Sequence, residues 1–292
     1  MQRTLRAKIA LAGSGEDRVG LQVKYCLLSA LVSATLFAQA KPEPAKKYPP
    51  MPRTADGKPD MTGVWQGGSN RIGTWEEVNA TGTGGEVTPF AVTPNREKAP
   101  YQDWAAAKVL ESYNRRGIDD PMARCLPAGV PRTTTMGLFP MQIVQTPKQV
   151  IMLFEVFRVF RVIPIFTKQD AKHPDDIEPS YSGDSVGYWD GDTLVVDVTG
   201  FNDETWLAGT GTFHSEDLHV VEKFKRVDYN TIQYEATIED PKVLTKPWVM
   251  RSTIMLREGT RLREYECNQN NQDLKRYDKL LEDESVFRRK PQ

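Results

Sequence analysis

The most closely spaced residues able to do chemistry are two histidines and a glutamate in the segment HSEDLH, residues 214–219. Two imidazoles and a carboxylate suit Zn, Fe or Mn, so His214, Glu216 and His219 are a candidate site for a divalent metal. The spacing argues against it, because on a strand His214 and Glu216 share a face that His219 does not. The alternatives are a histidine acting as general acid or base with Glu216 or Asp217, and a solvated polar segment. No other cofactor is predicted.

Carboxylates within apolar stretches form a second group of candidates. Glu222, Asp197 and Glu155 each interrupt a run of residues that is typical of a strand. Inside a barrel an ionised carboxylate needs a partner. The arginines on neighbouring predicted strands are Arg158, Arg161, Arg251 and Arg263. Such a cluster would orient a ligand or move a proton, whereas on the outer face of the sheet the same side chains would only meet water.

These patterns define two sets of candidate residues. The catalytic candidates are His214, Glu216, His219, Glu222 and Asp197. The ligand-binding candidates are Glu155, Arg158, Arg251, Trp189 and Trp206, in which the two indoles would stack on the ligand. Phosphate-binding loops, EF-hand loops and the nucleophile elbow of hydrolases do not occur in the sequence.

An export signal is predicted at residues 1–40. Lys24 precedes the apolar run Tyr25–Phe37, and Ala38-Gln39-Ala40 follows as a small-residue cleavage site. The polar stretch before Lys24 indicates a start codon assigned too early, with the true start near Val19. The run is too short to cross a bilayer, which takes roughly twenty residues. We therefore expect a periplasmic or secreted protein with no stable membrane span after cleavage, the alternative being an uncleaved signal anchor.

The remaining chain reads as a linker followed by one domain. Residues 41–59 are rich in proline and charge and predict an extended linker, and residues 60–287 predict a single domain. Without residues 1–40 the net charge is about −4 with both signs interspersed, which argues against nucleic-acid binding. Cys125 and Cys267 are then an even pair in an oxidising compartment, which favours a disulfide over two free thiols.

Alternating apolar residues from position 139 onward predict strands joined by short turns. The expected strands cover residues 141–145, 149–154, 156–165, 185–189, 193–199, 218–227, 231–238, 248–257 and 261–267. Amphipathic helices are expected at residues 101–116 and 273–287, and residues 66–100 predict a long loop or weak hairpin. The fold class is therefore all-β, a single antiparallel barrel of roughly eight to ten strands with two flanking helices.

Two resemblances follow from these segments. Gly63-Val64-Trp65 opening a β meander resembles the G-x-W start of lipocalins and other calycin-type barrels. The stretches at residues 119–132, 183–203, 214–226 and 240–248 are similar to a group of exported bacterial proteins of uncharacterised activity. The first helix lies between the first strand and the meander and the chain is longer, which departs from lipocalins.

The sequence leads to three functional hypotheses. The first is binding of a small, partly apolar organic molecule in the barrel interior. The second is a lyase, isomerase or hydrolase on the same barrel that uses the histidine and carboxylate candidates. The third is a structural protein of the cell envelope. The expected partner is a small-molecule ligand, and the sequence sets no oligomeric state.

Overall fold

The structure is a computed structural model that describes residues 48–67, 99–115, 118–137, 139–209, 211–269 and 271–282. All of these belong to one compact unit, Tyr48–Gln292. The predicted export signal, most of the loop predicted at 66–100 and the last residues of the second predicted helix lie outside the described residues.

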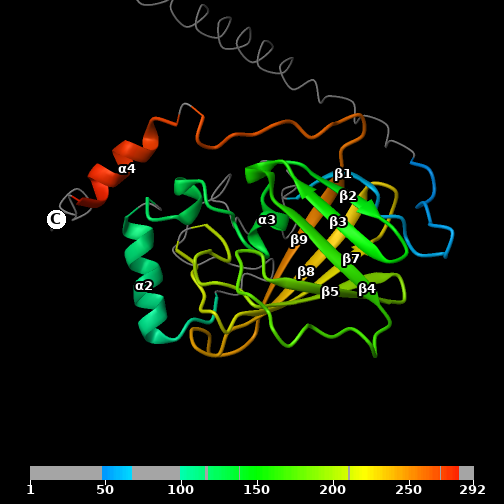
Figure 1. The fold of residues 1–292 in the computed structure, drawn as a ribbon, viewed down its shortest axis with the longest axis horizontal. Helices are drawn as coiled ribbons and strands as arrows, with labels where there is room; N and C mark the ends of the chain where they lie inside the picture. The colour runs from blue at the N-terminus through cyan, green and yellow to red at the C-terminus, as the bar shows by residue number, and fades with distance from the viewer. Residues whose placement is uncertain are drawn as a thin grey trace, which may run out of the picture. The chain divides into compact units, whose positions relative to one another are not determined.

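Nine strands close into a barrel in chain order (Figure 1). They are β1 (Gly63–Gln66), β2 (Met141–Gln145), β3 (Gln149–Phe154), β4 (Phe160–Phe166), β5 (Asp184–Asp190), β6 (Thr193–Thr199), β7 (His219–Arg226), β8 (Thr231–Glu239) and β9 (Trp248–Leu256). The ring closes because β9 pairs with β1. The predicted all-β barrel is confirmed.

Side-chain alternation decides what fills the barrel. On β7 the inward positions Val220, Glu222 and Phe224 are at most 1% exposed, whereas the alternate residues Lys223 and Lys225 point to water. Neighbouring strands obey the same rule, and the interior is occupied largely by apolar side chains. Glu222 is therefore an ionisable group held in an apolar core.

One strand pair departs from the antiparallel pattern. β4 and β5 run parallel, and their pairing is confined to Ile165↔Gly187 and Phe166↔Tyr188. Pro164 has no N–H to donate, which helps to end this ladder. Gly187 permits the close approach that remains, because a Cβ there would lie 2.8 Å from the Ile165 side chain. The first half of β4 therefore stands apart from β5, and this gap, the β4–β5 seam, positions the site described below.

Two of the predicted strands need correction. Residues 261–267 form no strand, because β1 already occupies the edge of β9 through Trp65↔Leu256. The strand predicted at 156–165 begins only at Phe160, since a 3-10 turn, η3 (Val156–Arg158), precedes it. Phe157 and Arg158 have φ of 53°, a left-handed conformation that breaks the extended chain.

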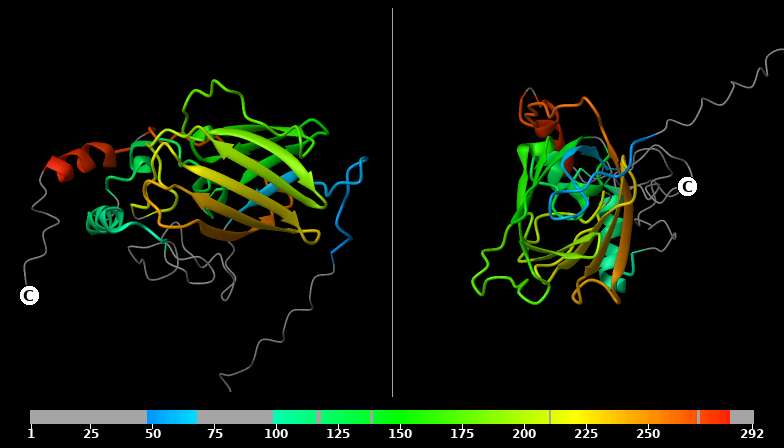
Figure 2. Two further views of the ribbon diagram at one scale, coloured as in Figure 1. Left: turned by 90° about the horizontal axis from the view of Figure 1, so that it is seen from below. Right: turned by 90° about the vertical axis from the view of Figure 1, so that its right-hand side faces the viewer.

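Helices and a disulfide flank the barrel. The predicted helices are confirmed as α2 (Asp103–Asn114) and α4 (Asp273–Glu282), and both lie beyond the same end of the barrel in Figures 1 and 2. Shorter helical pieces are η2 (Pro121–Arg124) and α3 (Arg132–Thr135). Cys125 after η2 and Cys267 before α4 form a disulfide with Cα atoms 5.5 Å apart, which confirms the predicted pairing.

The described end of the predicted linker lies against the barrel. Arg53 makes a two-pronged contact with the Asp192 carboxylate at 2.6 and 2.9 Å, and the Lys58 ammonium donates to the Gly191 carbonyl. These contacts hold residues 53–58 at the β5–β6 turn. Within the described part of the chain, no helix has the length and apolar character needed to cross a membrane.

Candidate functional site

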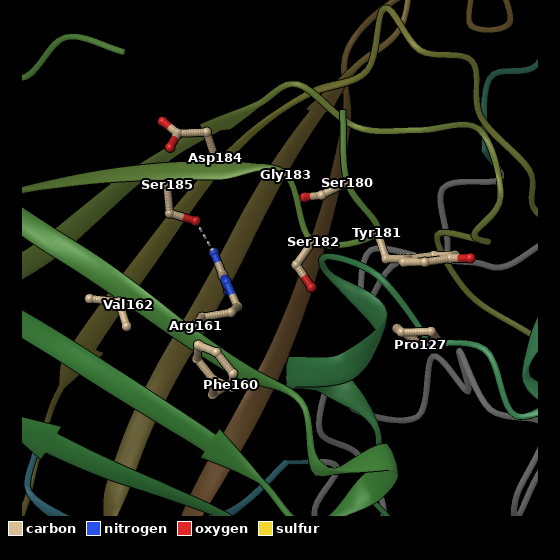
Figure 3. A pocket seen from close by; sticks show the side chains of 10 residues that line it. All are labelled: Pro127, Phe160, Arg161, Val162, Ser180, Tyr181, Ser182, Gly183, Asp184 and Ser185. Atoms are coloured by element: carbon tan, nitrogen blue, oxygen red, sulfur yellow. Dashed lines mark hydrogen bonds between the residues drawn. The ribbon is translucent and has the colours of Figure 1, made fainter. Parts of the chain in front are cut away.

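A pocket of about 310 Å³ lies over the β4–β5 seam (Figure 3). Its lining comes from Pro127, from β4 and from the segment that leads into β5. The lining residues are Pro127, Phe160, Arg161, Val162, Ser180, Tyr181, Ser182, Gly183, Asp184 and Ser185. This volume lies at the small end of the range for ligand pockets, roughly 300–1,000 Å³.

The outer wall of the pocket is apolar. Phe160 is 66% exposed and Val162 is 46% exposed, although both are large apolar side chains. They face outward because β4 alternates and places Arg161 and Ile163 on the inner side. Exposed apolar surface beside a pocket is characteristic of a binding site.

The inner end of the pocket is formed by a buried ion pair. The Arg161 guanidinium reaches across the seam, as Figure 3 shows, and donates through Nη2 to the Ser185 hydroxyl at 3.0 Å. The same nitrogen lies 2.6 Å from Oε2 of Glu222, and the two side chains are 2% and 0% exposed. The Tyr234 hydroxyl donates to the other Glu222 oxygen at 2.8 Å. This arrangement keeps a charged pair inside an apolar barrel.

The Tyr234 phenol remains a donor over the physiological range. Burial, and secondly the negative charge of Glu222, raise the pKa of Tyr234 well above its ordinary value. Tyr234 therefore stays protonated and stabilises the Glu222 carboxylate by donating a hydrogen bond to it.

Hydrogen-bonding capacity is left over at Arg161. Nε and Nη1 of the guanidinium are enclosed and have no hydrogen-bond partner among the described residues. Buried donors of this kind are rare in folded proteins and call for an acceptor from water or a ligand. Arg161 is thus anchored by Glu222 and keeps two enclosed donors that no described residue satisfies.

A chain of alternating carboxylates and imidazoles lies beside the pocket, on the outer face of β5 to β8. Nδ1 of His173 lies 2.5 Å from Asp184, and its Nε2 lies 3.0 Å from Oδ1 of Asp197. Nε2 of His219 lies 3.0 Å from the same Asp197 oxygen, and its Nδ1 is 3.4 Å from Glu239. Asp184 also lines the pocket, so this network, the outer His/Asp network, reaches the site.

Mutual contact shifts the titration of two members of this network. The hydrogen bond from Asp197 is the main cause that raises the pKa of His219 above its usual value. Burial by itself would raise the pKa of Asp197, but hydrogen bonds from His219 and His173 outweigh burial and lower it. The contact between His219 and Asp197 therefore favours the imidazolium and the carboxylate over their uncharged forms.

His214 has a different environment. Its ring is 2% exposed, with Nε2 at 2.6 Å from the Thr205 hydroxyl and Nδ1 at 2.8 Å from the Ser215 carbonyl. Because a carbonyl can only accept, Nδ1 carries the proton and Nε2 accepts from Thr205. Burial lowers the pKa of His214, so the ring is neutral and bridges two loop segments.

The structure separates the residues of the predicted metal site. His214 is buried, His219 lies on the outer barrel face and Glu216 is exposed to water. Within the described ranges, no group of three histidine, cysteine, aspartate or glutamate residues has a geometry that could hold a metal ion. The metal triad that the sequence raised as an alternative does not form in the described ranges, because the chain turns between His214 and the start of β7.

The other catalytic candidates fall into two groups. Asp197 and His219 are brought together in the outer His/Asp network, and Glu222 lies inside the barrel with Arg161. The sheet separates these groups, because Asp197 and Glu222 point to opposite faces. A mid-strand carboxylate does pair with one of the predicted arginines, Arg161, but β4 and β7 are not adjacent, and the two side chains meet inside the barrel.

The five ligand-binding candidates lie away from the pocket. Glu155 accepts from the Arg263 N–H at 2.6 Å, and Arg158 is an exposed partner of Glu264 and Glu266. The η3 turn removes Glu155 and Arg158 from the predicted strand. The remaining three are Arg251, paired with Glu235 at 2.8 Å, Trp189, which lies under the Lys58 ammonium, and Trp206, which is 7% exposed in the core. None of the five is among the residues that line the pocket.

Sequence reasoning missed His173, Tyr234, Ser185 and the segment at 180–184. His173 lies in an irregular connection, where no periodicity predicts its partners. An inward position for Tyr234, two residues from Ile232 and Ala236, was the available signal for a buried hydroxyl.

Comparison with known proteins adds no family assignment. No family model, no curated protein and no solved structure matches this chain. The site is therefore interpreted from its own geometry.

Proposed function

We propose that this protein binds a small, partly apolar organic molecule in the pocket at the β4–β5 seam. The observation that carries the proposal is Arg161, a buried guanidinium at the inner end of the pocket with two nitrogens lacking a partner among the described residues. Phe160 and Val162 supply the apolar wall, and Arg161 supplies hydrogen bonds to an oxygen of the ligand. The ligand thus lies in the barrel wall, with only its polar end directed into the interior.

The setting we propose is outside the cytoplasm. The predicted export signal and the Cys125–Cys267 disulfide both support a periplasmic or secreted carrier. Gly63 to Trp65 lie in β1, as the resemblance to lipocalin-type barrels implies. The barrel supports this comparison at the level of architecture, and the ligand proposal depends on the pocket.

The test is a matched pair of substitutions on β4. Phe160 and Phe166 are both exposed on the outer side of the same strand, but only Phe160 lines the pocket. Ligands are found by thermal-shift screening of small aromatic and aliphatic oxygen compounds, and their affinities are measured by calorimetry. We expect Phe160→Ala to weaken binding by about ten- to a hundredfold, the value of one buried phenyl ring, and Phe166→Ala to leave it unchanged.

Two results would contradict the proposal. One is a screen in which no compound stabilises the protein. The other is a ligand whose affinity falls equally in both variants, because a loss of that kind would reflect general damage to β4.

A second candidate function is catalysis of a proton shift. Asp184 belongs both to the pocket lining and to the outer His/Asp network, where His173 and Asp197 follow it. In an isomerase-type reaction Asp184 would take a proton from a ligand carbon and return it to another carbon, with His173 holding the carboxylate in place at 2.5 Å.

Deuterium incorporation tests this candidate without knowledge of the product. A bound ligand incubated with the protein in D₂O is expected to gain deuterium, and Asp184→Asn is expected to abolish the gain. Asp190→Asn, at an exposed turn position of the same strand, is the control. A ligand that binds but gains no deuterium would leave the protein as a carrier.

A further inference from the structure

The charge of Arg161 is already compensated within the protein. Glu222 lies 2.6 Å from the guanidinium, and both side chains are enclosed by the barrel. Short contact with a guanidinium and a hydrogen bond from Tyr234 are the environment of an ionised carboxylate. The buried pair as a whole is therefore neutral.

Arg161 still has hydrogen-bond donors without a partner in the described part of the chain. Both oxygens of Glu222 are engaged, by Arg161 and by Tyr234, while Nε and Nη1 of Arg161 are without partners among the residues described. A neutral oxygen acceptor completes such a group and adds no charge. A ligand carboxylate would instead place a second anion next to Glu222 in a region closed to water, where an uncompensated charge is costly.

The charged residues that line the pocket also disfavour an anionic ligand. Among the described lining residues, Arg161 and Asp184 are the only charged side chains. Glu222 already compensates Arg161, and Asp184 adds a carboxylate on the outer side of β5 (Figure 3), so the local balance is unfavourable for an anion.

We infer that the pocket selects uncharged ligands whose acceptor is a carbonyl or ester oxygen, over carboxylates of the same shape. This inference rests on the proposed function and specifies its ligand class. It differs from the first expectation for a buried arginine, which is recognition of a carboxylate or phosphate.

The experiment compares two fluorescent probes of nearly identical shape. One is a dimethylaminonaphthalene bearing an acetyl group, and the other bears a carboxylate at the same ring position. Both change emission when they leave water, and their dissociation constants are measured with the mature protein at neutral pH. We expect the ketone to bind at least about tenfold more tightly, and Arg161→Met to remove that advantage.

The results distinguish failure of the ligand-class inference from failure of the proposed binding function. Equal binding, or tighter binding of the carboxylate, overturns the inference and leaves a binding protein. Failure of both probes to bind, or binding insensitive to Arg161→Met, overturns the proposed site and the inference with it.

A charge-removing variant gives an independent readout. Glu222→Gln leaves the charge of Arg161 uncompensated, so the ratio of the two affinities is expected to move at least about tenfold toward the carboxylate. Glu235→Gln is the matched control, because Glu235 pairs with Arg251 at 2.8 Å on the outer face of the barrel. An unchanged ratio in folded Glu222→Gln contradicts the inference, and the wild-type ratio decides the question if that variant does not fold.

Discussion

Replacing Arg161 by an apolar residue should lower the free energy of unfolding strongly. Replacing its partner Glu222 at the same time should restore most of that loss. In Arg161→Met the Glu222 carboxylate, which is fully buried, keeps only the Tyr234 hydroxyl as a partner. An uncompensated buried charge of this kind costs about 3–5 kcal/mol, and the same holds for Glu222→Leu, which strands Arg161.

The double variant is expected to lose less than either single one. With Met and Leu in place of the pair, the remaining defect is the Tyr234 hydroxyl, which has lost its acceptor in a fully buried position. An unsatisfied buried hydroxyl costs about 1–3 kcal/mol. Adding Tyr234→Phe removes this defect, so the triple variant should come close to the stability of the wild type.

Equilibrium unfolding in urea, followed by the fluorescence of the six tryptophans, measures these differences. The outer pair Arg251–Glu235 is the control, since its side chains are 29% and 27% exposed and Arg251→Met should cost no more than about 1 kcal/mol. A double variant whose loss equals the sum of the two single losses would refute the reasoning, because the two charges would then not depend on each other.

Three further predictions concern other parts of the fold. The Cys125–Cys267 disulfide spans 142 residues, so its loss in a double alanine variant should lower stability by up to about 5 kcal/mol; equal urea midpoints with and without it would contradict this. The pKa of His219 is raised and that of Asp197 is lowered. Their contact therefore stabilises the folded protein at pH values between these two pKa values, and the contribution is lost as pH rises through the pKa of His219. Asp197→Asn should therefore destabilise more near pH 5.5 than near pH 8.5, by less than about 1 kcal/mol at this exposure, and a loss independent of pH would exclude the contact. Gly129 has φ of +75° and a Cβ there would lie 2.5 Å from a buried hydroxyl, so Gly129→Ala should cost roughly 1–3 kcal/mol; an unchanged melting temperature would count against this strain.

The alternation of residues along each strand predicted which side chains share a face of the sheet, but not which residues they contact. Glu222 lies between Val220 and Phe224, so its inward position follows from the period of a strand. Its partner Arg161 was one of four candidate arginines, and it lies on β4, which is not adjacent to β7, so the two side chains meet only because the closed barrel brings them together in its interior. His173 had no predicted partner, because its loop has no repeat from which a position follows.

The pocket illustrates the same limit. Phe160 and Val162 were expected in a strand, but not beside an opening in the barrel wall. That opening depends on a parallel pairing of β4 with β5 that starts only at Ile165. In a parallel pair the connecting segment returns to the end where the first strand began, so both strands run in the same direction, and nothing in the composition of the two strands predicts this.

The sequence by itself predicted the class of fold, the face that Glu222 shares with Val220 and Phe224, and the pairing of two cysteines. These properties follow from periodicity and composition, which act over a few residues or over the whole chain. The tertiary structure decided that Arg161 neutralises Glu222, that Asp197 joins His173 to His219 and that the pocket lies at the β4–β5 seam. Each of these depends on the register between strands far apart in the chain, which is set by packing of the closed barrel and not by any local pattern.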